Sequence, residues 1–236
     1  MKNFLMLTLA VTLTGTAVST KAQTVDEIVE KHITAMGGKD KLAAIKSTTT
    51  EGTMEVQGME FPFKATIINK RGMRIEFEAM GTKNVQVATT TGGWNLLGVQ
   101  QQTEPVDVPA ESLKEIGPDL DIEGELVNAK EKGHTLELIG KEPIDGGAEL
   151  YKIKLTRKDG NVANYFIDTK TYYITKRSAN MGGEEAINSL LDYKKTDDGY
   201  AYATVVETQP TGVKVKVNKI TFNPPVDEKI FDKPAK

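Results

Sequence analysis

The sequence predicts a mainly β protein of α+β type, in which about ten to eleven antiparallel strands form a curved sheet carrying a few small helices. Two observations support this prediction. After Thr48, hydrophobic and polar residues alternate over most of the chain, as in strands with one buried face. Short turn sequences at 158–160 (KDG) and 197–199 (DDG) separate alternating segments, as expected for antiparallel hairpins.

The composition indicates a folded chain with few residues suited to catalysis. The 236 residues include 30 Lys and Arg against 33 Asp and Glu, and the resulting net charge of −3 argues against nucleic-acid binding. Hydrophobic residues make up 39% of the chain, which is enough for a packed core. There is no Cys, which excludes disulfides, thiol catalysis and Cys-ligated zinc, and there are only two His.

The N-terminus has the pattern of a cleaved secretory signal peptide. Lys2 precedes residues 4–18, which are apolar or small and uncharged, and Ala22 suits the last position before cleavage. We therefore expect removal of residues 1–22 and an exported mature protein, residues 23–236, that folds as a single domain. An uncleaved anchor is the alternative, but a transmembrane span needs roughly 20 apolar residues.

An amphipathic helix is predicted at the start of the mature chain. Thr24 and Glu27 have the spacing of a capping box, and Gly37 and Gly38 suit a helix end. A shorter helical piece is expected at 39–45. The apolar stripe of the first helix contains Val25, Ile28, Val29, His32, Ile33 and Met36.

The alternating segments between Met54 and Leu96 share an apolar face that we interpret as the candidate ligand groove. An ordinary covered sheet core is the alternative, but few helices are available to cover so many strands. A sheet of about ten strands tends to curl, and curling around a small helical plug leaves space for an apolar guest. The candidate groove residues are Met54, Val56, Met59, Phe61, Phe63, Ile67, Met73, Ile75, Phe77, Val85, Val87, Trp94 and Leu96.

Residues 104–127 interrupt the strands with an irregular segment that contains a short helical piece at 110–116. Long segments of this kind in compact domains often form lids or binding loops. A carrier must tolerate its empty state, so lid or plug side chains should refill the groove. The candidate lid and plug residues are Val25, Ile28, Val29, Ile33, Met36, Leu113 and Ile116.

Motifs for catalysis or metal binding are not recognisable. His32 lies on an apolar helix stripe, where packing is its expected role, and His134 follows Gly133 in a turn-like stretch, where we expect a solvated side chain. We therefore expect no enzymatic activity, no cofactor and no metal. The alternating acids lack the EF-hand pattern, and we interpret them as the wet face of one strand: Asp119, Asp121, Glu123 and Glu125.

Several segments, taken in order, resemble one bacterial family. The first helix ends in Met36-Gly37-Gly38, and later segments read YKIKL at 151–155, YFID at 165–168 and ITFNPPVD at 220–227. Over nearly the whole mature chain, this pattern is similar to the outer-membrane lipoprotein-sorting proteins, relatives of the periplasmic lipoprotein carrier (the LolA-like superfamily). It resembles in particular the divergent version found in Bacteroidetes-type bacteria.

The resemblance implies an incomplete antiparallel half-barrel whose concave apolar face holds the acyl chains of a lipid or lipoprotein. It also implies a periplasmic monomer that docks transiently with membrane-bound release or acceptor proteins. In the carriers a basic residue near an early strand end influences lid opening, and Lys70 and Arg71 lie in a comparable place. The alternative on the same fold is an envelope sensor or interaction module that binds a protein partner and carries no lipid.

Overall fold

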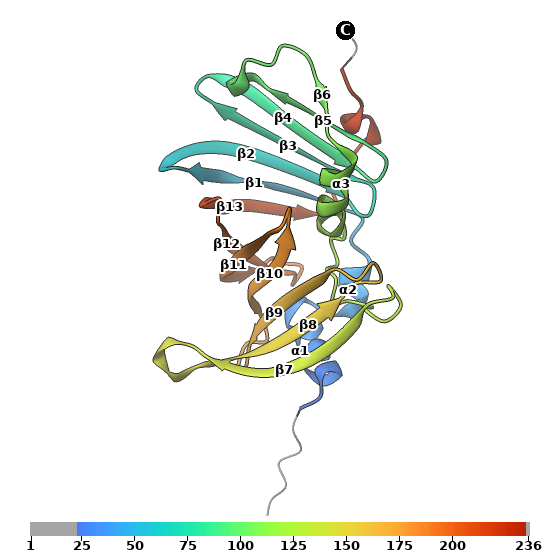
Figure 1. Cartoon of the computed structure of the whole chain (residues 1–236), viewed down its shortest axis with the longest axis vertical. Coiled ribbons are helices and arrows are strands. Elements are labelled where there is room, and N and C mark those ends of the chain that lie inside the picture. The colour runs from blue at the N-terminus through green and yellow to red at the C-terminus, as the bar shows by residue number, and fades with distance from the viewer. Residues whose placement is uncertain (1–22, 235–236) are drawn as a thin grey trace, which may run out of the picture.

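A computed structural model describes residues 23–234, which form one open antiparallel sheet with short helices against it (Figure 1). The signal peptide expected at residues 1–22 lies outside this range. The strands are β1 (Ser47–Val56), β2 (Met59–Ile68), β3 (Gly72–Ala79), β4 (Thr82–Thr89), β5 (Gly93–Leu97), β6 (Val106–Asp107), β7 (Thr135–Pro143), β8 (Glu149–Thr156), β9 (Val162–Asp168), β10 (Ile174–Met181), β11 (Glu184–Lys195), β12 (Ala201–Gln209) and β13 (Val213–Phe222).

The strands pair in the order β6-β5-β4-β3-β2-β1-β13-β12-β11-β10-β9-β8-β7. Each strand is therefore a neighbour of the next one in sequence except at the step from β6 to β7, and β13 returns to pair with β1. β6 and β7 are the two edges, so the sheet does not close into a barrel. The predicted mainly β, antiparallel and incompletely closed fold is confirmed, although the sheet has thirteen strands where about ten to eleven were expected.

The first predicted helix is confirmed as α1 (Val25–Met36). The backbone N–H of Thr24 donates to Oε2 of Glu27 at 2.9 Å, and the N–H of Glu27 donates to Oγ1 of Thr24 at 3.2 Å, which completes the capping box. Gly37 ends the helix with a φ of 130°, a conformation that favours glycine. The following piece, α2 (Lys39–Ala43), is shorter than the expected 39–45.

The two sheet faces are covered by different parts of the chain. We call the face against which α1, α2 and α3 (Ala110–Ile116) pack the helix face, and the opposite one the outer face. The C-terminal turn η4 (Glu228–Phe231) packs on the outer face of β3 and β4. The helix face includes Ile75, Ile153 and Tyr165, and the outer face includes Arg74 and Trp94.

The largest core lies on the helix face of β8, β9 and β10. Ile28 and Val29 of α1 pack there against a buried layer that includes Ile153, Tyr165 and Ile167. A second core joins α2 to the end of β13, where the rings of Tyr200 and Phe222 stack with centroids 4.2 Å apart. Figure 1 shows α1 and α2 beside the β7–β9 end of the sheet, whereas α3 lies near β4 and β5. The half of the sheet formed by β1–β5 therefore receives less helical cover.

One local expectation from the sequence was wrong. The segment with alternating acids does not form a strand; it is the 3₁₀ turn η2 (Gly117–Leu120) followed by turns. Strand β7 follows this segment and is interrupted by a bulge between Leu138 and Gly140. In residues 23–234, no helix is both long and apolar enough to cross a bilayer.

Candidate functional site

The helix face of β1–β3 and β13 carries a continuous apolar surface. Met54 lies opposite Phe61 on β2 and Val215 on β13, and Phe63 lies opposite Phe77 on β3. Partners in register share a face of the sheet, so these side chains form adjacent cross-strand rows. Most of them are partly exposed, and we call the set the central apolar face: Met54, Val56, Met59, Phe61, Phe63, Ile67, Met73, Ile75, Phe77 and Val215.

Four of the expected groove residues lie on the other face of the sheet. Met80 and Gly81 form a two-residue turn between β3 and β4, so odd positions on β3 pair with even positions on β4. Ile75 is therefore opposite Gln86 on the helix face, whereas Val87 is opposite Arg74 on the outer face. The sequence prediction was therefore wrong for four groove residues, which lie on the outer face: Val85, Val87, Trp94 and Leu96.

On the outer face, Trp94 belongs to a packed contact with the C-terminal turn. Trp94 is 4% exposed, and its indole N–H donates to the carbonyl oxygen of Phe231 at 2.9 Å. The guanidinium of Arg74 lies 5.7 Å from the Trp94 ring centroid, and its Nη1 donates to the carbonyl of Ile230 at 2.9 Å. The contact closes the outer face locally and leaves no room there for a ligand.

The helices differ in how firmly they are packed. Ile28 and Val29 of α1 are buried in the main core, with Val25 and Ile33 packed against them, and Met36 joins the α2 core. α3 has no buried residue among those described, and a cavity of about 240 Å³ lies beneath it, lined partly by Ile116, Met73 and Ile75. α1 is therefore held firmly against the core, whereas α3, with Leu113 and Ile116, is a more weakly held cover over this cavity.

Residues 117–125, which we call the strap, run from α3 toward the core and are held by the turn between β2 and β3. The backbone N–H of Lys70 donates to the carbonyl of Leu120 at 2.8 Å, and the side-chain oxygen of Asn69 accepts from the N–H of Ile122 at 3.1 Å. The Lys70 ammonium pairs with Glu123, and this hydrogen bond raises the pKa of Lys70. Lys132 also reaches the strap, donating to Asp121 at 2.5 Å.

The basic pair predicted near an early strand end is divided between two contacts. Lys70 contacts the strap, whereas Arg71 donates to Glu228 in the C-terminal turn at 2.7 Å. Both side chains are largely exposed, so each ion pair contributes little to stability.

A charge cluster that the sequence did not predict lies at the end of the strap, around Glu125. Glu125 is 6% exposed and accepts from Arg157 at 2.5 and 2.9 Å, from the hydroxyl of Tyr165 at 2.7 Å and from Arg177 at 3.2 Å. Burial alone would raise the pKa of Glu125, but these hydrogen bonds and the two guanidinium charges lower it to about 2. Glu125 is therefore a buried anion and not part of a wet strand face.

A cavity of about 380 Å³ lies between the strap and strands β9–β12. Leu126, Leu190 and Val206 line its apolar part, and Tyr165 and Arg177 line its polar part. Its apolar part belongs to the cross-strand row that contains Met54, since Leu190 pairs with Val206, Val206 with Val215 and Val215 with Met54. An apolar surface thus continues from the central apolar face to the charge cluster.

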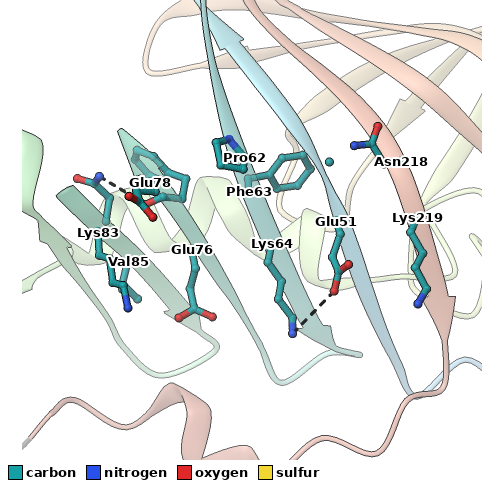
Figure 2. A pocket seen from close by; sticks show the side chains of 13 residues that line it. Glu51, Pro62, Phe63, Lys64, Glu76, Glu78, Lys83, Val85, Asn218 and Lys219 are labelled. Atoms are coloured by element: carbon teal, nitrogen blue, oxygen red, sulfur yellow. Dashed lines mark hydrogen bonds and ion pairs between the residues drawn. The ribbon is translucent and has the colours of Figure 1, made fainter. Parts of the chain in front are cut away.

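A larger depression, of about 520 Å³, has a different character. Most of the side chains around it belong to the outer face, where Glu51 lies opposite Lys64 and Lys64 lies opposite Glu76. Figure 2 shows the ammonium of Lys64 facing the carboxylate of Glu51, at a distance of 4.0 Å. An acyl chain would have to desolvate these charges, so the depression suits water and not lipid.

Neither histidine has the surroundings of a metal ligand. Nδ1 of His32 lies 2.9 Å from the carbonyl oxygen of Tyr172, and burial lowers the pKa of this ring. His134 is partly buried, not fully solvated as expected. Within the part of the chain that the structure describes, no group of three or more His, Asp or Glu could hold a metal ion.

Three solved structures have the same fold over most of their length. An outer membrane lipoprotein-sorting protein domain from Vibrio parahaemolyticus is 13% identical, with a TM-score of 0.56 over 87% of this chain and 95% of that one. A LolA superfamily protein from Nitrosomonas europaea is 12% identical, with a TM-score of 0.57 over 90% and 99%. A DUF1329 family protein from Desulfovibrio piger is 12% identical, with a TM-score of 0.59 over 88% and 97%.

The sequence itself matches no protein-family model and no curated protein. At 12–13% identity the likeness concerns the fold and not the activity. The chain has the open antiparallel fold of the LolA superfamily, as its sequence resemblance predicted.

Proposed function

We propose that this protein is a periplasmic carrier that binds the acyl chain of a lipid or lipoprotein and catalyses no reaction. The observation that carries the proposal is the central apolar face, a continuous and partly exposed apolar surface on the helix face of β1–β3 and β13. Apolar surfaces of this kind that remain open in a folded chain are commonly binding sites. The shared fold with a lipoprotein-sorting protein supports a role in outer-membrane lipoprotein sorting.

The energetics of such binding are favourable on this surface. Each buried CH₂ group contributes about 0.8 kcal/mol, so about ten groups contribute about 8 kcal/mol. That free energy corresponds to a micromolar Kd, before the costs of ordering the ligand and the cover are subtracted. Flexible Met54 and Met73 can repack around chains of different shape.

Release requires that the cover can move, and its contacts allow this. The C-terminal end of the strap is fixed because the next two residues, Leu126 and Val127, are buried. At the other end, α3 and residues 117–119 are mostly exposed. Lys70 joins the strap to the sheet through half-exposed ion pairs, which are individually weak. We therefore infer that α3 swings while Lys70 holds its hinge.

Native mass spectrometry of protein purified from its own cell envelope, followed by lipid extraction, tests the proposal. We expect co-purified acyl ligand. A titration with a fluorescent acyl probe then compares Phe61→Glu on the central apolar face with Val85→Glu on the outer face. Phe61→Glu should weaken binding at least tenfold, about 1.4 kcal/mol, and Val85→Glu should leave it unchanged.

Two results would contradict the carrier function. A folded protein that takes up no acyl probe lacks the binding that the proposal requires. Recovery of one protein partner without any lipid would favour the interaction-module alternative.

A further inference from the structure

A polar row crosses the helix face next to an apolar one. Arg177 on β10 lies opposite Tyr165 on β9 and Asn188 on β11, and Asn188 lies opposite Thr208 on β12. The hydroxyl of Thr208 donates to Oδ1 of Asn188 at 2.9 Å, which fixes the amide.

The adjacent row lies two residues further along each strand and is apolar. It contains Leu190, Val206, Val215, Met54 and Phe61, which are partners in register across five strands. Successive rows on one face are about 7 Å apart. An amphiphile lying on this surface could place its chain on the apolar row and its headgroup against the polar one.

Within the polar row, Arg177 is the cationic side chain, and it borders two cavities. Its side chain is 17% exposed and lines both the 380 Å³ cavity and a second cleft of about 280 Å³, to which Lys114 and Asn161 also contribute. Arg157 directs both Nε and Nη2 at Glu125, whereas Arg177 reaches Glu125 through Nη2 alone. On its Nη1 side Arg177 makes no hydrogen bond to a carboxylate of the described residues, although the Tyr165 side chain also interacts with this guanidinium.

Asp119 occupies that direction without making a good contact. Its Oδ1 lies 4.0 Å from Nη1 of Arg177, whereas charge-assisted hydrogen bonds between these groups measure about 2.7–2.9 Å. The Asp119 side chain is 55% exposed and lies at the movable end of the strap, next to Pro118. Displacing this carboxylate would therefore cost little interaction energy.

We propose that Arg177 binds the anionic headgroup, a carboxylate or phosphate, of an acyl ligand whose chain lies on the central apolar face. The headgroup takes the direction that Asp119 occupies in the empty protein. A planar guanidinium suits both oxyanions, since it presents paired donors. The inference rests on the proposed carrier function and narrows its ligand to anionic lipids such as fatty acids or phospholipids.

The test compares a fluorescent long-chain fatty acid with its methyl ester, which has the same chain and no charge. The protein should bind the acid more tightly. Asp119→Asn should tighten the acid about fivefold, because a competing anion is removed, and should not affect the ester. Arg177→Gln should reduce the affinity for the acid about tenfold, to that of the ester.

The matched control is Asp159→Asn, which neutralises another acid of the same cleft that does not pair with Arg177. The affinity of the Asp159→Asn variant for the fatty acid should equal that of the unaltered protein. Asp119→Asn also keeps the test valid if Arg177→Gln fails to fold, because Asp119 is exposed and contributes no hydrogen bond to Glu125.

Three outcomes would overturn the inference. Equal affinities for acid and ester, unchanged in Asp119→Asn, would remove the headgroup site and leave the carrier function standing. Binding of neither probe would overturn both. Competition by inorganic phosphate as strong as that by lysophosphatidic acid would show a site for free anions that does not need an acyl chain.

Discussion

The ring of Phe63 lies against Gly52 across the β1–β2 pair, at the centre of the apolar face. A Cβ on Gly52 would be 2.9 Å from Cε1 of this ring and 2.0 Å from the carbonyl oxygen of Lys216. Gly52 stands at the point where the register between β1 and β13 shifts. The missing side chain therefore allows both the aromatic ring and the neighbouring backbone to come close.

Gly52→Ala should destabilise the protein, because the added methyl group collides with backbone and not only with a flexible side chain. We expect a loss of about 2 kcal/mol or more in the free energy of unfolding, measured by urea denaturation. Gly92→Ala is the control, since nothing lies within 4 Å of a Cβ there, and should change stability by less than about 0.5 kcal/mol. Equal effects of the two changes would refute the close-approach explanation.

Glu125→Gln should lower stability in a pH-dependent way. The pKa of Glu125 falls from 4.5 to about 2 on folding, so its contribution is complete above pH 4.5 and is lost as the pH drops toward 2. At neutral pH the substitution should cost about 3 kcal/mol, from the linkage between pKa and stability. Urea unfolding at several pH values should show this difference shrinking below pH 4.5. A difference that stays constant with pH would contradict the buried-anion assignment.

Lys70→Gln should loosen the strap locally without unfolding the sheet. The ammonium loses its pairs with Glu123 and Asp121, worth at most about 1 kcal/mol. Hydrogen–deuterium exchange should become faster at the amide of Ile122 and unchanged in β8 and β9. Lys64→Gln, which removes a comparably exposed lysine and its ion pair on the outer face, is the control and should leave the strap unaffected. Identical exchange in both variants would mean that Lys70 does not hold the strap.

Phe231→Ala should expose the indole of Trp94. The chain has a single Trp, so its fluorescence reports on this contact alone. We expect a red-shifted emission maximum, because losing the ring that packs against Gly72 of β3 should loosen the turn whose carbonyl accepts from the indole. Glu228→Ala removes only an exposed ion pair with Arg71 and should leave the emission unchanged. An unshifted spectrum in Phe231→Ala would show that the C-terminal turn does not shield Trp94.

The sequence predicted the strands well because alternation is a local property. It did not predict which strands present the same positions to the same face, since that depends on turn length. Because the turn at Met80-Gly81 has two residues, odd positions on β3 share a face with even positions on β4. Val85 and Val87 therefore lie on the face opposite to the expected groove. Counting pairs across this turn would have found the inversion.

The charge cluster could not be inferred in the same way. Arg157 and Arg177 follow Glu125 by 32 and 52 positions along the chain, and the three residues meet only after β8–β10 have paired. An alternating run of acids is ordinarily solvated, and composition carries no information on which acid is buried. The packing of α1 against the core, by contrast, followed from its one apolar stripe, which is visible in the sequence.

The most direct measurement is photo-crosslinking with a fatty acid that carries a diazirine on its chain, followed by peptide mapping. We expect adducts on the helix face of β1–β3, at Met54, Phe61, Phe63 or Ile75. Adducts concentrated at Val85 or Leu96 on the outer face, or no adducts at saturating probe, would show that the open apolar face does not bind an acyl chain.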